Sequence, residues 1–164
     1  MDKPKESQVR TRVMDILRNH DQEARVIEAQ IAAEKESLEY VLEEILMSGA
    51  YPSTAINPTG VRASSPEPDG NLVRMVDRRD RRRARADEAI ANLERQLRQI
   101  EEVRSLVLTM DTRSKCVLLA LYYPFRSYKE AADFLHMAKA TIYRQRKTAL
   151  DSLFATMYKS DSFR

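Results

Sequence analysis

The chain of 164 residues has no tryptophan, one cysteine and only three glycines. The single Cys116 excludes an intrachain disulfide and a cysteine-based zinc site, and such sparing use of cysteine fits a reducing cytoplasm. No apolar run reaches the roughly 18 to 20 residues that a membrane-spanning helix needs. The N-terminal stretch MDKPKESQ also lacks the apolar core of a signal peptide. We therefore expect a soluble, cytoplasmic protein with no membrane partner.

Catalytic and metal-binding patterns are also missing. The sequence shows no paired carboxylates, no glycine-rich phosphate loop and no Ser/His/Asp set. Its two histidines, His20 and His136, lie far apart in the chain and are too isolated to suggest a metal site or a general base. We therefore expect no enzymatic activity, no cofactor and no bound metal.

Helix-breaking residues are concentrated in one segment. All three glycines and four of the six prolines fall between residues 49 and 70, without hydrophobic periodicity. Residues 51–70 are therefore predicted to form a linker. The rest of the chain is free to be helical.

Apolar residues on both sides of this linker recur at the three- and four-residue spacing of amphipathic helices. Residues 1–50 are predicted to form one such helix, or two if Asp21 caps a second helix after the polar stretch RNHDQ. Residues 71–110 are predicted to form a second long helix with a coiled-coil seam. The apolar positions are Val13, Ile16, Ile27, Ile31, Leu38, Val41, Ile45, Leu72, Val76, Ile90, Leu93, Leu97, Ile100 and Val107. The helices can pair within one chain or between two, and we expect a homo-oligomer formed through this coiled coil.

Six arginines occur in the segment DRRDRRRARADE, residues 77–88. We interpret them as spread around the circumference of the second long helix, solvated and paired with acids, so that no single stripe faces phosphates. Whether residues 78–85 contact DNA stays open at this point.

Positive charge is concentrated at the C-terminal end. Residues 1–50 contain seven Lys/Arg and eleven Asp/Glu, whereas residues 111–164 contain ten and five. This asymmetry suggests a polyanion as the partner of the C-terminal region.

From residue 111 onward the pattern changes to short helices with clear boundaries. Asp111 or Thr112 can cap the first helix, and Ser127 followed by Glu130 forms a capping box that begins the second. A third helix is predicted over residues 139–157, with its apolar residues on one side. Its first twelve residues, KATIYRQRKTAL, contain four cations and no acid.

Ala132, His136 and Ile142 have the spacing of a small residue, a tight-turn residue and a buried β-branched residue in a helix-turn-helix. The segment SYKEAADFLHMAKATIYRQRKTAL resembles the helix-turn-helix of sigma-factor region 4, and most closely that of the phage ArpU- and RinA-type transcriptional regulators. The resemblance covers about residues 111–157. It implies a three-helix domain at residues 111–164. Together with the periodicity of the long helices, this predicts an all-α fold in which coiled-coil helices, as a hairpin or a dimer, precede that domain.

The resemblance also implies roles for individual residues. The positions that would face base edges in the major groove are Lys139, Ala140, Tyr143 and Arg144. The positions that would hold phosphates are Ser127, Tyr128, Thr141, Arg146 and Lys147. Three residues depart from the family pattern: His136 replaces a turn glycine, Ala138 replaces a capping serine, and Arg146 replaces a buried leucine. The stem of Arg146 is therefore expected to lie along the edge of the core.

The function implied is that of a sequence-specific, double-stranded DNA-binding transcriptional regulator of phage or prophage origin. It would act in the cytoplasm of a bacterial host, as a dimer or in contact with RNA polymerase, because one helix-turn-helix buries little surface on its own. Two alternatives stay open. One is an adaptor that binds proteins of the transcription machinery, and the other is the DNA-recognition subunit of a phage packaging complex.

Overall fold

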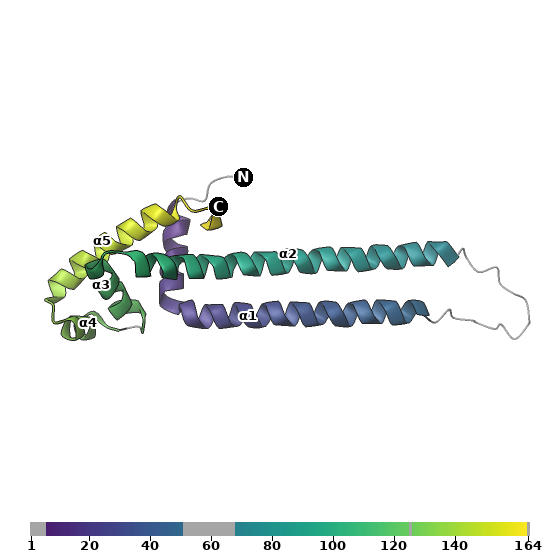
Figure 1. The fold of residues 1–164 in the computed structure, drawn as a ribbon, viewed down its shortest axis with the longest axis horizontal. Coiled ribbons are helices and arrows are strands. Elements are labelled where there is room, and N and C mark those ends of the chain that lie inside the picture. The colour runs from purple at the N-terminus through teal and green to yellow at the C-terminus, as the bar shows by residue number, and fades with distance from the viewer. Residues whose placement is uncertain (1–5, 51–67, 125, 164) are drawn as a thin grey trace, which may run out of the picture. The chain divides into compact units, whose positions relative to one another are not determined.

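The computed structural model describes residues 6–50, 68–124 and 126–163. These residues form α-helices and one short 3-10 helix, with no strand among them, so the predicted all-α class is confirmed (Figure 1). The elements are α1 (Glu6–Ala50), α2 (Pro68–Thr109), α3 (Thr112–Tyr122), α4 (Tyr128–Leu135), α5 (Lys139–Met157) and η1 (Asp161–Phe163). The predicted linker, residues 51–70, lies outside the described residues apart from its last three.

The boundaries of the long helices differ in part from those expected. α1 is one continuous helix, so Asp21 does not cap a second helix and instead lies beside His20, with Oδ1 3.3 Å from Nε2. α2 begins at Pro68, three residues before the predicted start at residue 71. Proline is favourable in the first turn of a helix because its missing N–H would have no intrahelical acceptor there.

The chain divides into two compact units that cut across the predicted domains. The first unit comprises Met1–Ile27 and Arg95–Arg164, and the second comprises Glu28–Glu94. Each long helix therefore contributes to both units. The predicted domains, with boundaries at the linker and at residue 110, assigned each long helix to a single domain.

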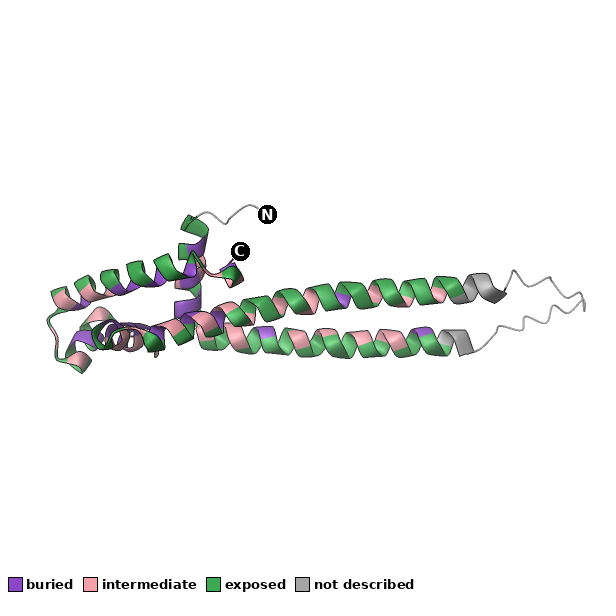
Figure 2. Ribbon diagram, turned by 45° about the horizontal axis from the view of Figure 1, so that its top comes forward, coloured by how far each residue is buried: buried purple, intermediate pink, exposed green. Residues whose placement is uncertain are grey.

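The core of the first unit is built from four helices. Residues of α1, α2, α3 and α5 are completely or almost completely buried there (Figure 2). The largest of them are Ile16, Leu17, Val103, Val107, Leu118, Ile142, Leu153 and Met157. Burying each such side chain contributes about 1.5 to 3 kcal/mol. α3 contacts both α4 and α5, and α4 contacts α5, so the three short helices are anchored on this core.

The second unit pairs residues 28–50 of α1 with residues 68–94 of α2, which lie side by side in Figures 1 and 2. Ile45 and Ala86 are buried between them. Most other predicted seam positions in this unit are only half-buried, and Val76 is exposed, which corrects its assignment to the seam. Among the described residues, each helix of this pair packs against only one other helix of the unit, so part of its apolar stripe remains in contact with solvent.

The arginines of α2 are arranged differently from the prediction. Five of them line one shallow hollow of about 290 Å³, namely Arg74, Arg78, Arg81, Arg82 and Arg85, together with Asp77. Residues at these three- and four-residue spacings share one side of a helix. The interpretation that the arginines form no stripe is therefore wrong for Arg78, Arg81 and Arg85, which lie at these spacings, and Arg74 extends their row by one turn. Arg79 and Arg83 do not line the hollow.

Candidate nucleic-acid interface

The capping box at the start of α4 is confirmed. Ser127 Oγ accepts a hydrogen bond from the Glu130 amide at 3.3 Å, and Glu130 Oε2 accepts one from the Ser127 amide at 2.7 Å. The hydrogen bond from the Ser127 backbone lowers the pKa of the Glu130 carboxyl below its ordinary value. The Ser127 hydroxyl is thus occupied by the Glu130 amide, and the Glu130 carboxylate lies at the start of α4. This arrangement does not favour the phosphate-binding role expected of Ser127.

A tight turn joins α4 to α5. His136 adopts the left-handed conformation, with φ 52° and ψ 42°, as expected for the residue that replaces a turn glycine. The amide of Met137 donates to the Ala132 carbonyl at 3.0 Å, which closes the end of α4. Ala138 supplies no side-chain cap for α5. The turn therefore depends on backbone hydrogen bonds and on the contacts of Ala131 and Ala132, which are both buried.

α5 spans the predicted residues 139–157 and separates its two sides as expected. The buried residues are Ile142, Ala149, Leu150, Leu153, Phe154 and Met157. The exposed residues among those assigned to DNA are Lys139, Ala140, Tyr143, Arg144 and Lys147, whereas Thr141 is half-buried. Tyr143 is 48% exposed, so a large aromatic side chain lies in solvent among cations.

Tyr143 is held by an aromatic neighbour that sequence reasoning missed. Its ring stacks on that of Tyr128 with the centroids 4.1 Å apart and the planes 19° from parallel. Tyr128 is half-buried, and burial raises the pKa of its hydroxyl while Arg146 opposes that rise. The stack orients one exposed aromatic of α5 through the first residue of α4. No pattern in the sequence shows that these two tyrosines meet, because the contact depends on how α4 and α5 pack.

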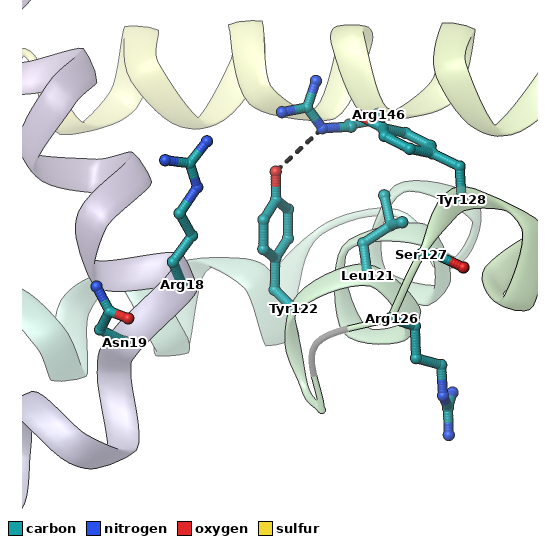
Figure 3. A pocket seen from close by; sticks show the side chains of 8 residues that line it. All are labelled: Arg18, Asn19, Leu121, Tyr122, Arg126, Ser127, Tyr128 and Arg146. Carbon is teal, nitrogen blue, oxygen red and sulfur yellow. Dashed lines mark hydrogen bonds between the residues drawn. The ribbon is translucent and has the colours of Figure 1, made fainter.

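Arg146 is half-buried and contacts two tyrosines of the protein. Its Nε donates a hydrogen bond to the Tyr122 hydroxyl at 3.0 Å, and its guanidinium lies 5.7 Å from the centre of the Tyr128 ring (Figure 3). The side chain is half-buried, in line with the expectation that its stem runs along the core edge. The Tyr122 hydroxyl thus accepts the hydrogen of Arg146 Nε, and the assignment of Arg146 to a phosphate stays a prediction for the rest of its guanidinium.

A cavity of about 610 Å³ adjoins this arginine. Its lining consists of Arg18, Asn19, Leu121, Tyr122, Arg126, Ser127, Tyr128 and Arg146, with no acidic residue among them. In Figure 3 the Arg126 side chain points away from the cavity, and its guanidinium lies 4.2 Å from the Phe134 ring centre. Arg18 was not singled out from the sequence, since it comes from α1 and reaches this place only through the tertiary fold.

Two further titratable groups of the first unit, His20 and Tyr123, pack against each other. The Tyr123 ring lies 3.9 Å from that of His20, and its buried hydroxyl has no hydrogen-bond partner among the described residues. Burial raises the pKa of Tyr123 to about 12. Within residues 6–50, 68–124 and 126–163, no three His, Cys, Asp or Glu side chains converge as metal ligands, and no helix is long and apolar enough to cross a bilayer.

Comparison of the chain with protein-family models, curated proteins and solved structures finds no match. The candidate interface is therefore argued from its own geometry.

Arg146 and Tyr122 are predicted to be coupled in stability. Removing either partner of a buried hydrogen bond leaves the other unsatisfied, so Arg146→Ala and Tyr122→Phe should each lower the free energy of unfolding, by about 1 to 3 kcal/mol for the arginine. The double variant should lose less than the sum of the two. Urea unfolding of the three variants measures this coupling. Lys147→Ala, one residue away but exposed, is the control, and strictly additive losses would contradict the assignment.

Proposed function

We propose that the protein is a sequence-specific double-stranded DNA-binding regulator of transcription, of phage or prophage origin, that reads the major groove with α5. The observation that carries the proposal is the exposed, cationic side of α5 directly after the left-handed turn at His136. An α-helix fits the major groove, and side chains of its first turns reach base edges in helix-turn-helix proteins.

The electrostatics of α5 support contact with a polyanion. Lys139, Arg144 and Lys147 are exposed, and the first acid of the helix is Asp151, three turns from its start. The unpaired amide groups at the helix N-terminus add partial positive charge at the same end. A phosphate strand near the beginning of α5 would therefore meet no carboxylate on this helix until Asp151.

Tyr143 and Arg144 are the residues proposed to read bases. Arginine forms paired hydrogen bonds with guanine, and an aromatic edge can contact the methyl group of thymine. Tyr143 is fixed by its stack on Tyr128, so less conformational freedom is lost when it meets DNA than for a free side chain.

The paired long helices are proposed to mediate homo-oligomerisation or contact with RNA polymerase. In the second unit Tyr40, Leu46 and Met47 are 70%, 62% and 60% exposed. Such large apolar side chains on one helix indicate a surface that another protein covers. A second copy would supply a second helix-turn-helix. The dimer could then bind two half-sites of the DNA, which tight specific binding needs.

The salt dependence of DNA binding tests this proposal. Each phosphate neutralised contributes about −0.9 to the slope of log K against log salt. Replacing Lys139, Arg144 and Lys147 together with alanine should therefore make the slope less negative, by about 0.9 per protomer for the phosphate assigned to Lys147 and by at most about 2.7 where all three side chains also neutralise phosphates. Fluorescence anisotropy with a labelled duplex at several salt concentrations gives both slopes.

The control variant loses the same charge from exposed residues of the first unit outside α4 and α5, namely Arg25, Arg98 and Arg113. It should keep the wild-type slope. Equal slopes for wild type and for the α5 variant would contradict the proposal. If instead the wild type had no measurable affinity for any duplex, the result would contradict the proposal and favour the protein-binding adaptor.

A further inference from the structure

A second cationic surface lies on α2, in the unit that does not contain α5. It is the hollow lined by Arg74, Arg78, Arg81, Arg82 and Arg85, in which Asp77 is the one acid. Five guanidinium groups facing one carboxylate give this surface a strong local positive charge.

Most of these arginines have no partner in the described part of the chain. Arg82 is engaged by α1, since its Nη2 donates to Ser37 Oγ at 3.0 Å and lies 3.8 Å from Glu34 Oε2. By contrast, Arg74, Arg78, Arg81 and Arg85 are exposed and form no hydrogen bond or ion pair with any described residue. We call these four residues the arginine stripe.

The dimensions of the arginine stripe fit a nucleic-acid backbone. At 1.5 Å per residue, its ends are about 16 Å apart along α2. Because successive phosphates of one DNA strand are about 3.4 Å apart along the duplex axis, this length spans about four or five of them. Guanidinium groups match phosphate oxygens in pairs of hydrogen bonds, and four like charges held along one side of a helix repel one another until an anion neutralises them.

We propose that the arginine stripe binds the sugar-phosphate backbone of duplex DNA without reading bases, as a second contact surface of the same chain. The stripe lies within a long helix and not at the start of a helix that follows a tight turn, which is where α5 is proposed to reach base edges. The choice of DNA as the polyanion rests on the function proposed for α5. A chain with two such surfaces gains affinity because binding at one raises the effective concentration of DNA at the other.

The test compares two double variants of the full-length protein. Arg78→Ala with Arg81→Ala removes half of the arginine stripe. Arg79→Ala with Arg83→Ala removes the same charge from α2 at positions that do not line the hollow. Affinity for a long duplex of arbitrary sequence is measured by fluorescence anisotropy at several salt concentrations, and circular dichroism verifies that both variants keep their helices.

The stripe variant is expected to make the slope of log K against log salt about 1.8 less negative per protomer and to weaken binding about 10- to 100-fold near 0.1 M salt. The control variant should stay within about threefold of wild type, because distant charges are largely screened at that salt concentration. Equal losses in the two variants would overturn the proposal, since only net charge would then matter. An unchanged slope with a lower molecular mass in light scattering would overturn it too, because the stripe would then contact an acidic surface of a second copy.

These experiments distinguish failure of the stripe proposal from failure of the function proposed for α5. If the alanine variant of Lys139, Arg144 and Lys147 binds DNA as wild type does while the stripe variant does not, the stripe stands and the proposal for α5 fails. If the alanine variant of α5 loses DNA binding while the stripe variant has the same affinity and slope as the Arg79/Arg83 control, the proposal for the stripe fails and the proposal for α5 is retained.

Discussion

Replacing Arg144 with alanine is expected to relax base preference at one position of the bound DNA by roughly 1 to 3 kcal/mol, which is the discrimination given by one paired arginine–guanine contact. Arg144 is exposed on the side of α5 that carries Tyr143. Binding to the preferred sequence should weaken, whereas binding to sequences that already differ at that position should change little. Competition between the preferred duplex and its single-base variants measures the difference.

Lys147→Ala is the matched comparison for Arg144→Ala. Both residues are exposed cations of α5, but Lys147 lies one turn further from the start of the helix, where side chains meet phosphates. Its removal should weaken binding to every sequence by a similar factor, with base preference unchanged. If both variants changed affinity for all duplexes alike, the assignment of Arg144 to a base edge would be wrong.

Truncating Ile142 to alanine is expected to lower the free energy of unfolding by about 2 to 5 kcal/mol, because a fully buried side chain leaves a cavity behind. Ile142 is 0% exposed and precedes Tyr143 directly in α5. DNA affinity should fall together with stability, since the same turn of helix presents the cations and anchors them to the core. Urea unfolding followed by circular dichroism gives the loss of stability.

Two further variants, one milder change at Ile142 and one control at Thr148, are compared with Ile142→Ala. Ile142→Val removes a single methylene and should cost about 0.5 to 1.5 kcal/mol, with DNA binding retained. Thr148→Ala changes an exposed position of the same helix and should stay within about 0.5 kcal/mol of wild type. A loss below 1 kcal/mol for Ile142→Ala would show that α5 is not anchored at this residue.

Features governed by local hydrogen bonding could be predicted from the sequence. The cap of α3 is Asp111, which accepts from the Ser114 amide at 3.0 Å, and the capping box at Ser127 and the left-handed His136 are present as expected. Each depends on residues a few positions apart, so the chemistry of the side chain and its neighbours is sufficient. The bounds of α5 also agree with the prediction, although Ala138 supplies no side-chain cap at its start.

Features that depend on packing between helices could not be predicted in this way. The bond between Arg146 and Tyr122, the stack of Tyr143 on Tyr128, and the place of Arg18 beside the cavity all join different helices. A periodic pattern shows which side of a helix is buried but not which side chain it meets. The arginine stripe is a different case, because the three- and four-residue spacing of Arg78, Arg81 and Arg85 is visible in the sequence itself.

Selection of the wild-type protein from a pool of randomised DNA duplexes tests most directly whether α5 reads DNA. The expected result is enrichment of one short sequence, with the preference at a single position lost when the same pool is selected by the Arg144→Ala protein. A bound pool with the same base composition at every position as the input pool would contradict sequence-specific binding.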